Sequence, residues 1–193
     1  YPNFALMKFI DTHSHLYSSE FDSDRTLIIK EAISTGVSKI LLPNISSEYT
    51  EGMLKICNEF PENCFPMMGL HPCDVNKDNI DNELVHVEQE LAKGKYIAVG
   101  EIGLDLHWDK TKLEIQKEAF IHQIEIAKKY KLPIAIHVRD SFTEAIEIIE
   151  KLNDENLSGV FHCFTGSVED AQRVINLGGF YLGIGGVLTF KNS

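Results

Sequence analysis

The sequence of 193 residues has few cysteines, a shortage of basic residues and no long apolar run. Its four cysteines lack Cys-x-x-Cys spacing, which argues against a disulfide framework, so we expect thiols that pack as small apolar groups. No run approaches the roughly 18 apolar residues of a membrane span, so we expect no membrane association. Lys and Arg number 18 against 29 Asp and Glu, a formal net charge of -11, which argues against an extended basic surface for duplex phosphates.

The composition is that of an ordinary globular domain, because 44% of the residues are hydrophobic and 24% are charged. Residues 1–6 differ from the apolar strand pattern that follows them, so we interpret them as an N-terminal extension. We expect one domain over residues 7–193. A cytoplasmic or nuclear location is expected, because we find no targeting pattern and the thiols are unpaired. No feature of the sequence indicates a protein partner.

Short apolar runs alternate with amphipathic segments along the whole chain. We predict strands over residues 8–13, 39–44, 65–71, 96–101, 133–138, 159–163 and 179–185. Their nearly continuous apolar character is typical of parallel strands that are covered on both faces. Apolar residues at helical spacing fill the intervals, and Ser167 with Asp170 forms a capping signal for the last helix. This alternation predicts βαβ units and an α/β fold.

The strand count leaves two architectures open. A closed (β/α)₈ barrel needs eight strands, and this sequence offers seven. The chain is therefore either an open α/β sheet or a barrel whose eighth unit is missing.

Polar residues end most of the predicted strands, where parallel α/β folds place their active sites. His13 and His15 are two residues apart, so both imidazoles would lie on one face of a strand. Residues of metal-binding or catalytic type at or just after the strand ends are His13, His15, His71, Glu101, Asp105, His137, Arg139 and His162. Imidazoles combined with a carboxylate suit Zn, Mn, Fe or Ni, whereas Mg prefers oxygen and water. Two such cations about 4 Å apart can activate a water for phosphoester displacement.

The motifs around these residues resemble the TatD family of metal-dependent deoxyribonucleases, within the amidohydrolase superfamily. The matching segments are His13-Ser14-His15, Gly69-Leu70-His71-Pro72, Gly100-Glu101-Ile102-Gly103-Leu104-Asp105, Ile136-His137-Val138-Arg139 and Phe161-His162-Cys163-Phe164-Thr165-Gly166-Ser167. They occur in the family's order from about Met7 to the last residue. The resemblance implies a TIM-type (β/α) barrel, and it implies hydrolysis of DNA phosphodiesters, in some members as a 3′ exonuclease on single strands.

The resemblance also implies roles for individual residues. His13 and His15 would bind one divalent metal ion, His137 and His162 a second, and Glu101 would bridge the two. The ions would be Mg, Mn or Zn, and they would activate the attacking water. His71 and Arg139 would contact the scissile phosphate or its neighbours, and together with Glu101 they form the expected catalytic set.

The sequence departs from the family pattern after Phe190. The pattern continues into an eighth β/α unit whose strand carries an aspartate, usually within Glu-Thr-Asp, which binds the first metal and orients the attacking water. No residue of this sequence matches that aspartate. We therefore expect a C-terminally incomplete barrel, and we favour a segment of a longer protein over a natural truncation that pairs with a second copy. A third explanation is a degenerate member without hydrolytic activity.

Several assignments stay open between two interpretations. Arg139 is either a phosphate contact or a structural ion pair. Asp105 is a substrate contact, a residue that supports a ligand, or a helix cap. Trp108 either stacks on a base or packs on the barrel rim. For the whole protein, the alternatives to a deoxyribonuclease are a D-aminoacyl-tRNA deacylase or other ester or amide hydrolase, and a non-catalytic protein that binds metal or nucleic acid.

Overall fold

A computed structural model describes residues 8–191 of the chain. The predicted extension at residues 1–6 lies outside the described residues. The strands are β1 (Phe9–Asp11), β2 (Val37–Pro43), β3 (Cys64–Met67), β4 (Val99–Asp105), β5 (Ile134–Arg139), β6 (Gly159–Phe161) and β7 (Phe180–Leu182). The helices are α1 (Arg25–Ser34), α2 (Thr50–Glu59), α3 (Ile80–Leu91), α4 (Leu113–Tyr130), α5 (Phe142–Leu152) and α6 (Val168–Asn176).

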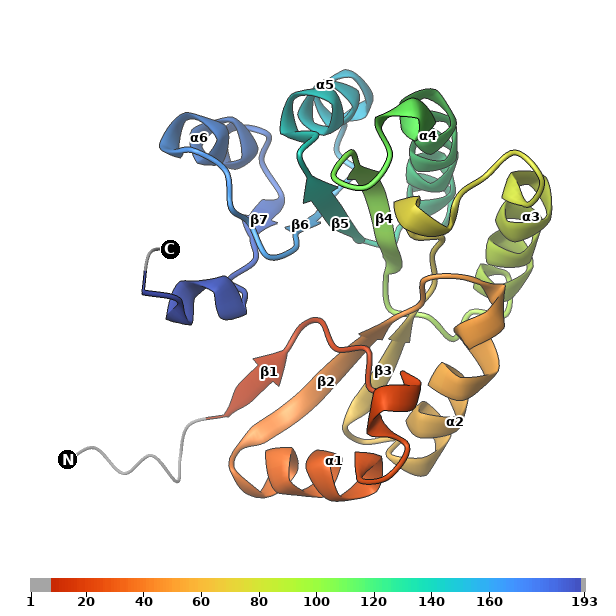
Figure 1. The fold of residues 1–193 in the computed structure, drawn as a ribbon, viewed down its shortest axis with the longest axis vertical. Helices are drawn as coiled ribbons and strands as arrows, with labels where there is room; N and C mark the ends of the chain where they lie inside the picture. The colour runs from red at the N-terminus through yellow and green to blue at the C-terminus, as the bar shows by residue number, and fades with distance from the viewer. Residues whose placement is uncertain (1–7, 192–193) are drawn as a thin grey trace.

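The seven strands are parallel and follow one another in chain order. Strands β1 to β3 form one sheet and β4 to β7 another. A parallel bridge between Met68 and Val99 joins the two, and the Ile97 amide donates to the Pro66 carbonyl at 3.1 Å beside it. The strands thus form one curved row with the helices on its outer side (Figure 1). The predicted α/β fold of TIM-barrel type is confirmed.

The row curves far enough to bring its first and last strands to the same side of the molecule, opposite α3 (Figure 1). Both end strands carry exposed apolar side chains, because Phe9 and Ile10 of β1 and Tyr181 of β7 are only partly covered. None of the helices described over residues 8–191 is long and apolar enough to cross a membrane.

All seven predicted strands are present, but their bounds differ at the functional ends. β1 ends at Asp11, so His13 and His15 lie in the loop after the strand rather than within it. β4 lies further along the chain than predicted. The strand runs from Val99 to Asp105, not over residues 96–101, and it is buried along its whole length. Apolar content alone placed its end at Glu101, because Gly103 interrupts the pattern, although Gly103 pairs with His137 of β5.

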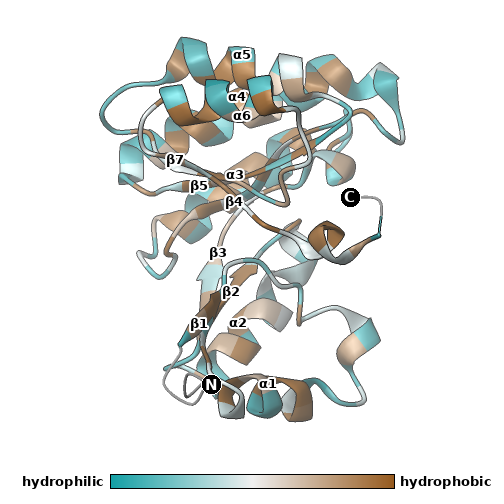
Figure 2. Cartoon of the chain, turned by 90° about the vertical axis from the view of Figure 1, so that its left-hand side faces the viewer, coloured by the Kyte–Doolittle hydropathy of each residue, from teal (hydrophilic) through white to brown (hydrophobic). Residues whose placement is uncertain are grey.

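The core lies between the strands and the inner faces of the helices. Phe120 and Ile124 of α4, Ile149 of α5 and Phe161 of β6 are at most 1% exposed. Apolar and polar residues alternate around the helices in Figure 2, as expected for helices that bury one side. The capping box predicted at Ser167 and Asp170 is present at the start of α6. This core holds the carboxyl ends of the strands in fixed positions around the site.

Candidate metal centre

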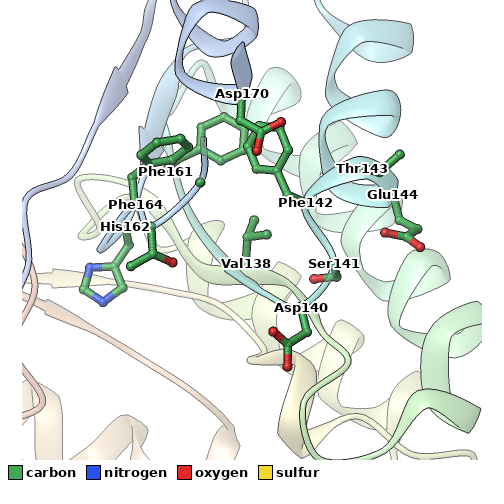
Figure 3. A pocket seen from close by; sticks show the side chains of 12 residues that line it. Val138, Asp140, Ser141, Phe142, Thr143, Glu144, Phe161, His162, Phe164 and Asp170 are labelled. Carbon is green, nitrogen blue, oxygen red and sulfur yellow. The ribbon is translucent and has the colours of Figure 1, made fainter. Parts of the chain in front are cut away.

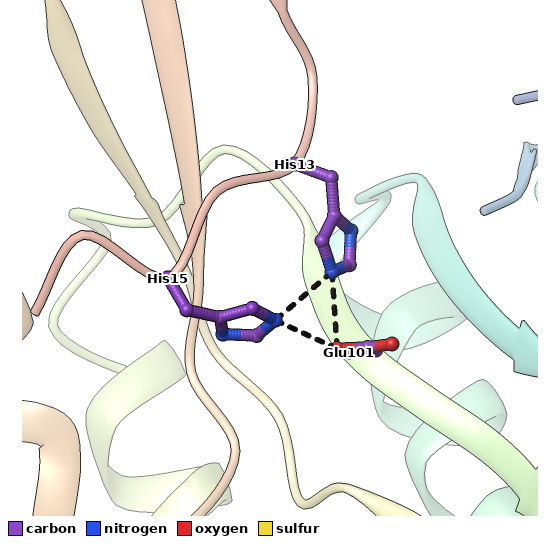
Figure 4. Close-up of side chains that lie close together, drawn as sticks. All are labelled: His13, His15 and Glu101. Carbon is purple, nitrogen blue, oxygen red and sulfur yellow. Dashed lines mark hydrogen bonds and ion pairs between the residues drawn. The ribbon is translucent and has the colours of Figure 1, made fainter. Parts of the chain in front are cut away.

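Two histidines from the loop after β1 meet a glutamate of β4. The Nε2 atoms of His13 and His15 lie 3.0 and 3.2 Å from Oε2 of Glu101, and 3.2 Å from each other (Figure 4). Three atoms that can each offer a lone pair therefore converge on one point. His13 and Glu101 are almost fully buried, whereas the His15 side chain is 35% exposed. The group is open to solvent on the side of His15.

A second group forms on the other oxygen of the same glutamate. Nδ1 of His137 lies 2.8 Å from Oε1 of Glu101, and Nε2 of His71 lies 3.7 Å from it. Each group has the composition and spacing that can hold a metal ion. Glu101 thus directs one oxygen to each group, which is the arrangement required of a bridging carboxylate.

Glu101 enters the site because β4 is irregular at that point. The register between β4 and β5 shifts between Val99 and Ile102, so Glu101 does not continue the regular ladder. Its amide instead donates to the carbonyl of Asn44, just after β2, at 3.1 Å. A local irregularity of this kind redirects a side chain within a strand. It explains how a residue inside a fully buried strand reaches the ligand groups.

The side chains of the site are better suited to bind a divalent cation than to hydrogen-bond one another. Burial alone would raise the pKa of Glu101, but its close contacts with His13, His137 and His15 hold that pKa well below its usual range, so the carboxylate is charged. Nδ1 of His13 is buried without a hydrogen-bond partner. An ionised carboxylate facing three imidazoles is the donor chemistry of a transition-metal site.

Tyr17 fixes the ring of His15. The Tyr17 hydroxyl donates to the carbonyl of Pro43 at 2.6 Å, so it accepts the proton of His15 Nδ1, which lies 2.7 Å away. The lone pair of His15 is therefore on Nε2, the atom that faces Glu101. Burial raises the pKa of Tyr17, so the hydroxyl keeps its proton. Such outer partners orient ligand histidines in metal sites.

The same reasoning gives His71 a different role from His15. The amide of Cys73 donates to Nδ1 of His71 at 3.1 Å, which leaves the proton of the neutral ring on Nε2. Burial lowers the pKa of His71 to about 4, so the ring is neutral near pH 7. His71 therefore directs an N–H group, not a lone pair, toward the site. This geometry suits contact with a phosphate oxygen.

His137 lies between two carboxylates. Its Nδ1 contacts Glu101, and its Nε2 lies 2.8 Å from Oδ2 of Asp105. Although burial disfavours the charged ring, these two carboxylates raise the pKa of His137. Asp105 is buried, and it also accepts the amide proton of His107. The contact with His137 makes Asp105 a residue that positions the ligand in this structure.

His162 lies beside these groups and belongs to neither. Its ring stacks on that of His13, with 3.4 Å between the centroids. Burial and the neighbouring His13 lower the pKa of His162 to about 4, so the ring is neutral and retains a lone pair. The expected pairing of His162 with His137 on a second metal stays a prediction.

The remaining predicted residues lie at the rim. The Arg139 guanidinium lies over the Trp108 ring, 5.4 Å from its centroid, and Trp108 is 74% exposed. Trp108 packs at the rim against Arg139 and the His107 ring, whose centroid lies 4.9 Å from its own, and Arg139 forms no ion pair within residues 8–191. Asp11 accepts the amide proton of His13 at 3.0 Å, whereas Asp140 contacts His107, away from the ligand histidines.

Two positioning residues were missed from the sequence, and one expectation is wrong. Tyr17 was missed, and so was Arg25, which donates to the carbonyls of Leu16 and Ser18 and thereby fixes the loop after His15. A local motif does not reveal either role, because both depend on where the loop folds back. The expectation that every cysteine is buried fails for Cys73, which is exposed in the loop after β3.

Comparison with known proteins agrees with this geometry. The family model described as TatD related DNase matches residues 10–193. The uncharacterized metal-dependent hydrolase YabD of Bacillus subtilis is 36% identical over 95% of this chain and 71% of its own length. The 3'-5' ssDNA/RNA exonuclease TatD of Cronobacter sakazakii is 31% identical over 91% of this chain and 66% of its own length.

A solved structure agrees as well. The crystal structure of YJJV, a TatD homolog from Escherichia coli, superposes with a TM-score of 0.86 at 30% identity, covering 96% of this chain and 71% of that one. A parallel (β/α) row with imidazoles and a carboxylate at its mouth, together with these relatives, defines a metal-dependent hydrolase. Within that class, the chain belongs to the TatD-related DNase family.

Proposed function

We propose that this protein hydrolyses phosphodiester bonds of single-stranded DNA from the 3′ end, using two divalent cations. The observation that carries the proposal is the sharing of Glu101 between two ligand groups, one on each of its oxygens. The relative from Cronobacter sakazakii, named as a 3'-5' ssDNA/RNA exonuclease, supports the choice of substrate and direction.

His13, His15 and Glu101 would hold the first cation, and Glu101, His137 and His162 the second. The ions would be Mg, Mn or Zn. Their positive charge would neutralise the phosphate and make a water molecule a stronger nucleophile. Local cations of this kind would also provide attraction for the substrate that a chain with a net charge of -11 does not provide through its surface.

The protein's own residues would bind and orient the phosphate. His71 would donate its Nε2 proton to a phosphate oxygen, since its Nδ1 already accepts from Cys73. Arg139 would approach the phosphate from the rim, where Trp108 supports its guanidinium. Tyr17 and Asp105 would keep His15 and His137 in orientation through their 2.7 and 2.8 Å contacts.

Hydrolysis of a 3′-labelled single-stranded oligonucleotide, with Mg²⁺, Mn²⁺ or Zn²⁺ supplied in turn, tests the proposal. Glu101→Ala should reduce the rate by more than the roughly 10- to 100-fold that loss of an outer partner of a ligand costs, because both ligand groups lose an oxygen. Glu118→Ala, on the exposed face of α4, removes a carboxylate without touching the site and serves as the control. Wild-type turnover by the Glu101 variant would refute the shared-ligand mechanism.

The same assay separates phosphodiester hydrolysis from ester hydrolysis by the same metal centre. Single-stranded DNA and a D-aminoacyl-tRNA are offered to the metal-loaded wild type in parallel. We expect DNA cleavage to be the faster reaction. Deacylation faster by a hundredfold or more would overturn the proposal in favour of a deacylase, and metal-dependent turnover of neither substrate would favour a binding protein.

A further inference from the structure

A pocket opens beside the metal centre and is not accounted for by the ligand groups. Its volume is about 360 Å³, and it lies between the loops that follow β5 and β6 (Figure 3). His162 forms one end of it, and Phe142, Phe161 and Phe164 form an aromatic wall. The Phe142 ring lies 5.9 Å from each of the other two rings, so the three pack as one cluster, in which Phe161 is buried and Phe142 and Phe164 are the more accessible rings. A flat, aromatic ligand fits against such a cluster.

The polar part of the pocket carries acceptors and hydroxyl groups but no cationic side chain. Its polar lining comes from Asp140, Ser141, Thr143, Glu144, His162, Thr165 and Asp170. No Lys or Arg is among the lining residues, so the pocket disfavours a phosphate. It favours a neutral group whose edge donates hydrogen bonds.

Strand β5 separates this pocket from the proposed phosphate contact. Val138 and Asp140 line the pocket, whereas Arg139 between them lies over Trp108. Val138 and Arg139 are consecutive residues of the extended strand, so their side chains point to opposite sides, and the chain leaves the strand at Asp140. A nucleotide bound at the metal centre would therefore meet a cation on one side of this segment and an aromatic, acidic pocket on the other.

We infer that this pocket binds the base of the nucleotide next to the scissile phosphate, an inference that rests on the proposed nuclease function. The aromatic wall supplies the stacking surface, as aromatic side chains do for single-stranded nucleic acids. Glu144 supplies the acceptor. Within residues 8–191 its carboxylate has no hydrogen bond or ion pair, whereas Asp170 caps α6 and Asp140 contacts His107. A carboxylate favours cytosine, adenine and guanine, whose exocyclic amino groups each carry two N–H donors, over thymine, whose single donor is the ring N3–H.

Gly166 gives a second way to test the pocket. A Cβ atom at this position would lie 2.7 Å from Cζ of Phe164, so Gly166→Ala would displace the ring that forms part of the wall. Gly52→Ala is the matched control, because a Cβ there would lie 3.8 Å from its nearest neighbour, the Cβ of Tyr17, which is an ordinary contact.

The experiment measures kcat and KM of the Mn²⁺-loaded protein on oligonucleotides that differ only in the terminal base. Wild type should favour dC, dA and dG over dT by about tenfold, the size expected for one hydrogen bond to a charged group. Glu144→Gln should remove most of this preference, while Glu118→Gln should keep it. Gly166→Ala should raise KM about tenfold for all four bases with little change in kcat, since stacking contributes to binding.

The possible failures are distinguishable. If the wild type cleaves none of the oligonucleotides, the proposed nuclease function fails. If it cleaves them while Glu144→Gln keeps the base preference and Gly166→Ala keeps KM, the function stands and the base pocket is refuted. The metal content of both variants, measured by elemental analysis, should equal that of the wild type, and its loss would mean that the metal centre was disturbed instead.

Discussion

At the scale of single residues, the position of one proton distinguishes His71 from His162. His71 accepts the Cys73 amide on Nδ1 and so presents a donor, whereas the neutral ring of His162 can present a lone pair. The two histidines are therefore not equivalent, although His71 belongs to the second group and His162 lies beside the first. The resemblance to the TatD family predicts different roles for the two histidines, and the structure adds the position of the proton on His71.

This difference predicts different metal contents for two variants. His71→Ala should still bind close to two cations per chain but lose activity by roughly 100-fold or more, as removal of a hydrogen-bond donor to a reacting oxygen does. His162→Ala should bind close to one. Elemental analysis of the purified proteins, with His122→Ala as the control, gives the count. A loss of one cation from the His71 variant would show that His71 is itself a ligand.

Tyr17 gives a second prediction at this scale. Tyr17→Phe removes the acceptor for the His15 Nδ1 proton and keeps the ring, so metal affinity should fall by about 10- to 100-fold. Tyr49→Phe is the matched control, since its ring packs 5.5 Å from that of Tyr17. Isothermal titration with Zn²⁺ or Mn²⁺ measures the affinity. Equal affinities for the two variants would exclude a positioning role for Tyr17.

At the scale of elements, the start of α6 is the clearest case of a local signal that the structure confirms. The Ser167 hydroxyl accepts the Asp170 amide, and the Asp170 carboxylate accepts the Ser167 amide. Ser167→Ala should lower the free energy of unfolding by about 1 kcal/mol. Urea denaturation measures the change, with the exposed Ser19→Ala as the control. An unchanged midpoint would mean that the cap contributes nothing to stability.

The elements also mark the limit of prediction from the sequence. The seven strands follow from their apolar runs, and the cap of α6 follows from Ser167 and Asp170. The displacement of β4 does not, because its irregularity depends on a backbone contact between Glu101 and Asn44, 57 residues earlier in the chain. The role of Tyr17 was hidden for the same reason, since its hydroxyl donates to Pro43 across the fold. A local sequence pattern does not reveal contacts between distant segments.

At the scale of the whole molecule, the metal centre joins the two sheets. His13 and His15 follow β1 of the first sheet, and Glu101 belongs to β4 of the second. A cation bound by all three would therefore link parts of the fold that β-sheet pairing joins only around the bridge from Met68 to Val99. Metal binding and stability should be coupled in this protein.

This coupling predicts a shift in thermal unfolding. A cation at about 100 times its dissociation constant stabilises the folded state by about 2.7 kcal/mol, which corresponds to about 5 to 10 °C in Tm for a chain of this size. Scanning calorimetry with EDTA and then with Mn²⁺ measures the shift. Glu101→Ala should show little of it. An equal shift in that variant would place the stabilising ion elsewhere.

The close approach of the two sheets beside their bridge depends on a residue that has no side chain. A Cβ atom at Gly69 would lie 2.8 Å from the carbonyl carbon of Gly100 and 2.9 Å from Cγ2 of Ile102. Any larger residue at this position would therefore push β4 away from the loop that follows β3. The metal centre should therefore be sensitive to substitution at position 69, a residue that offers no ligand and lies beside the strand that carries Glu101.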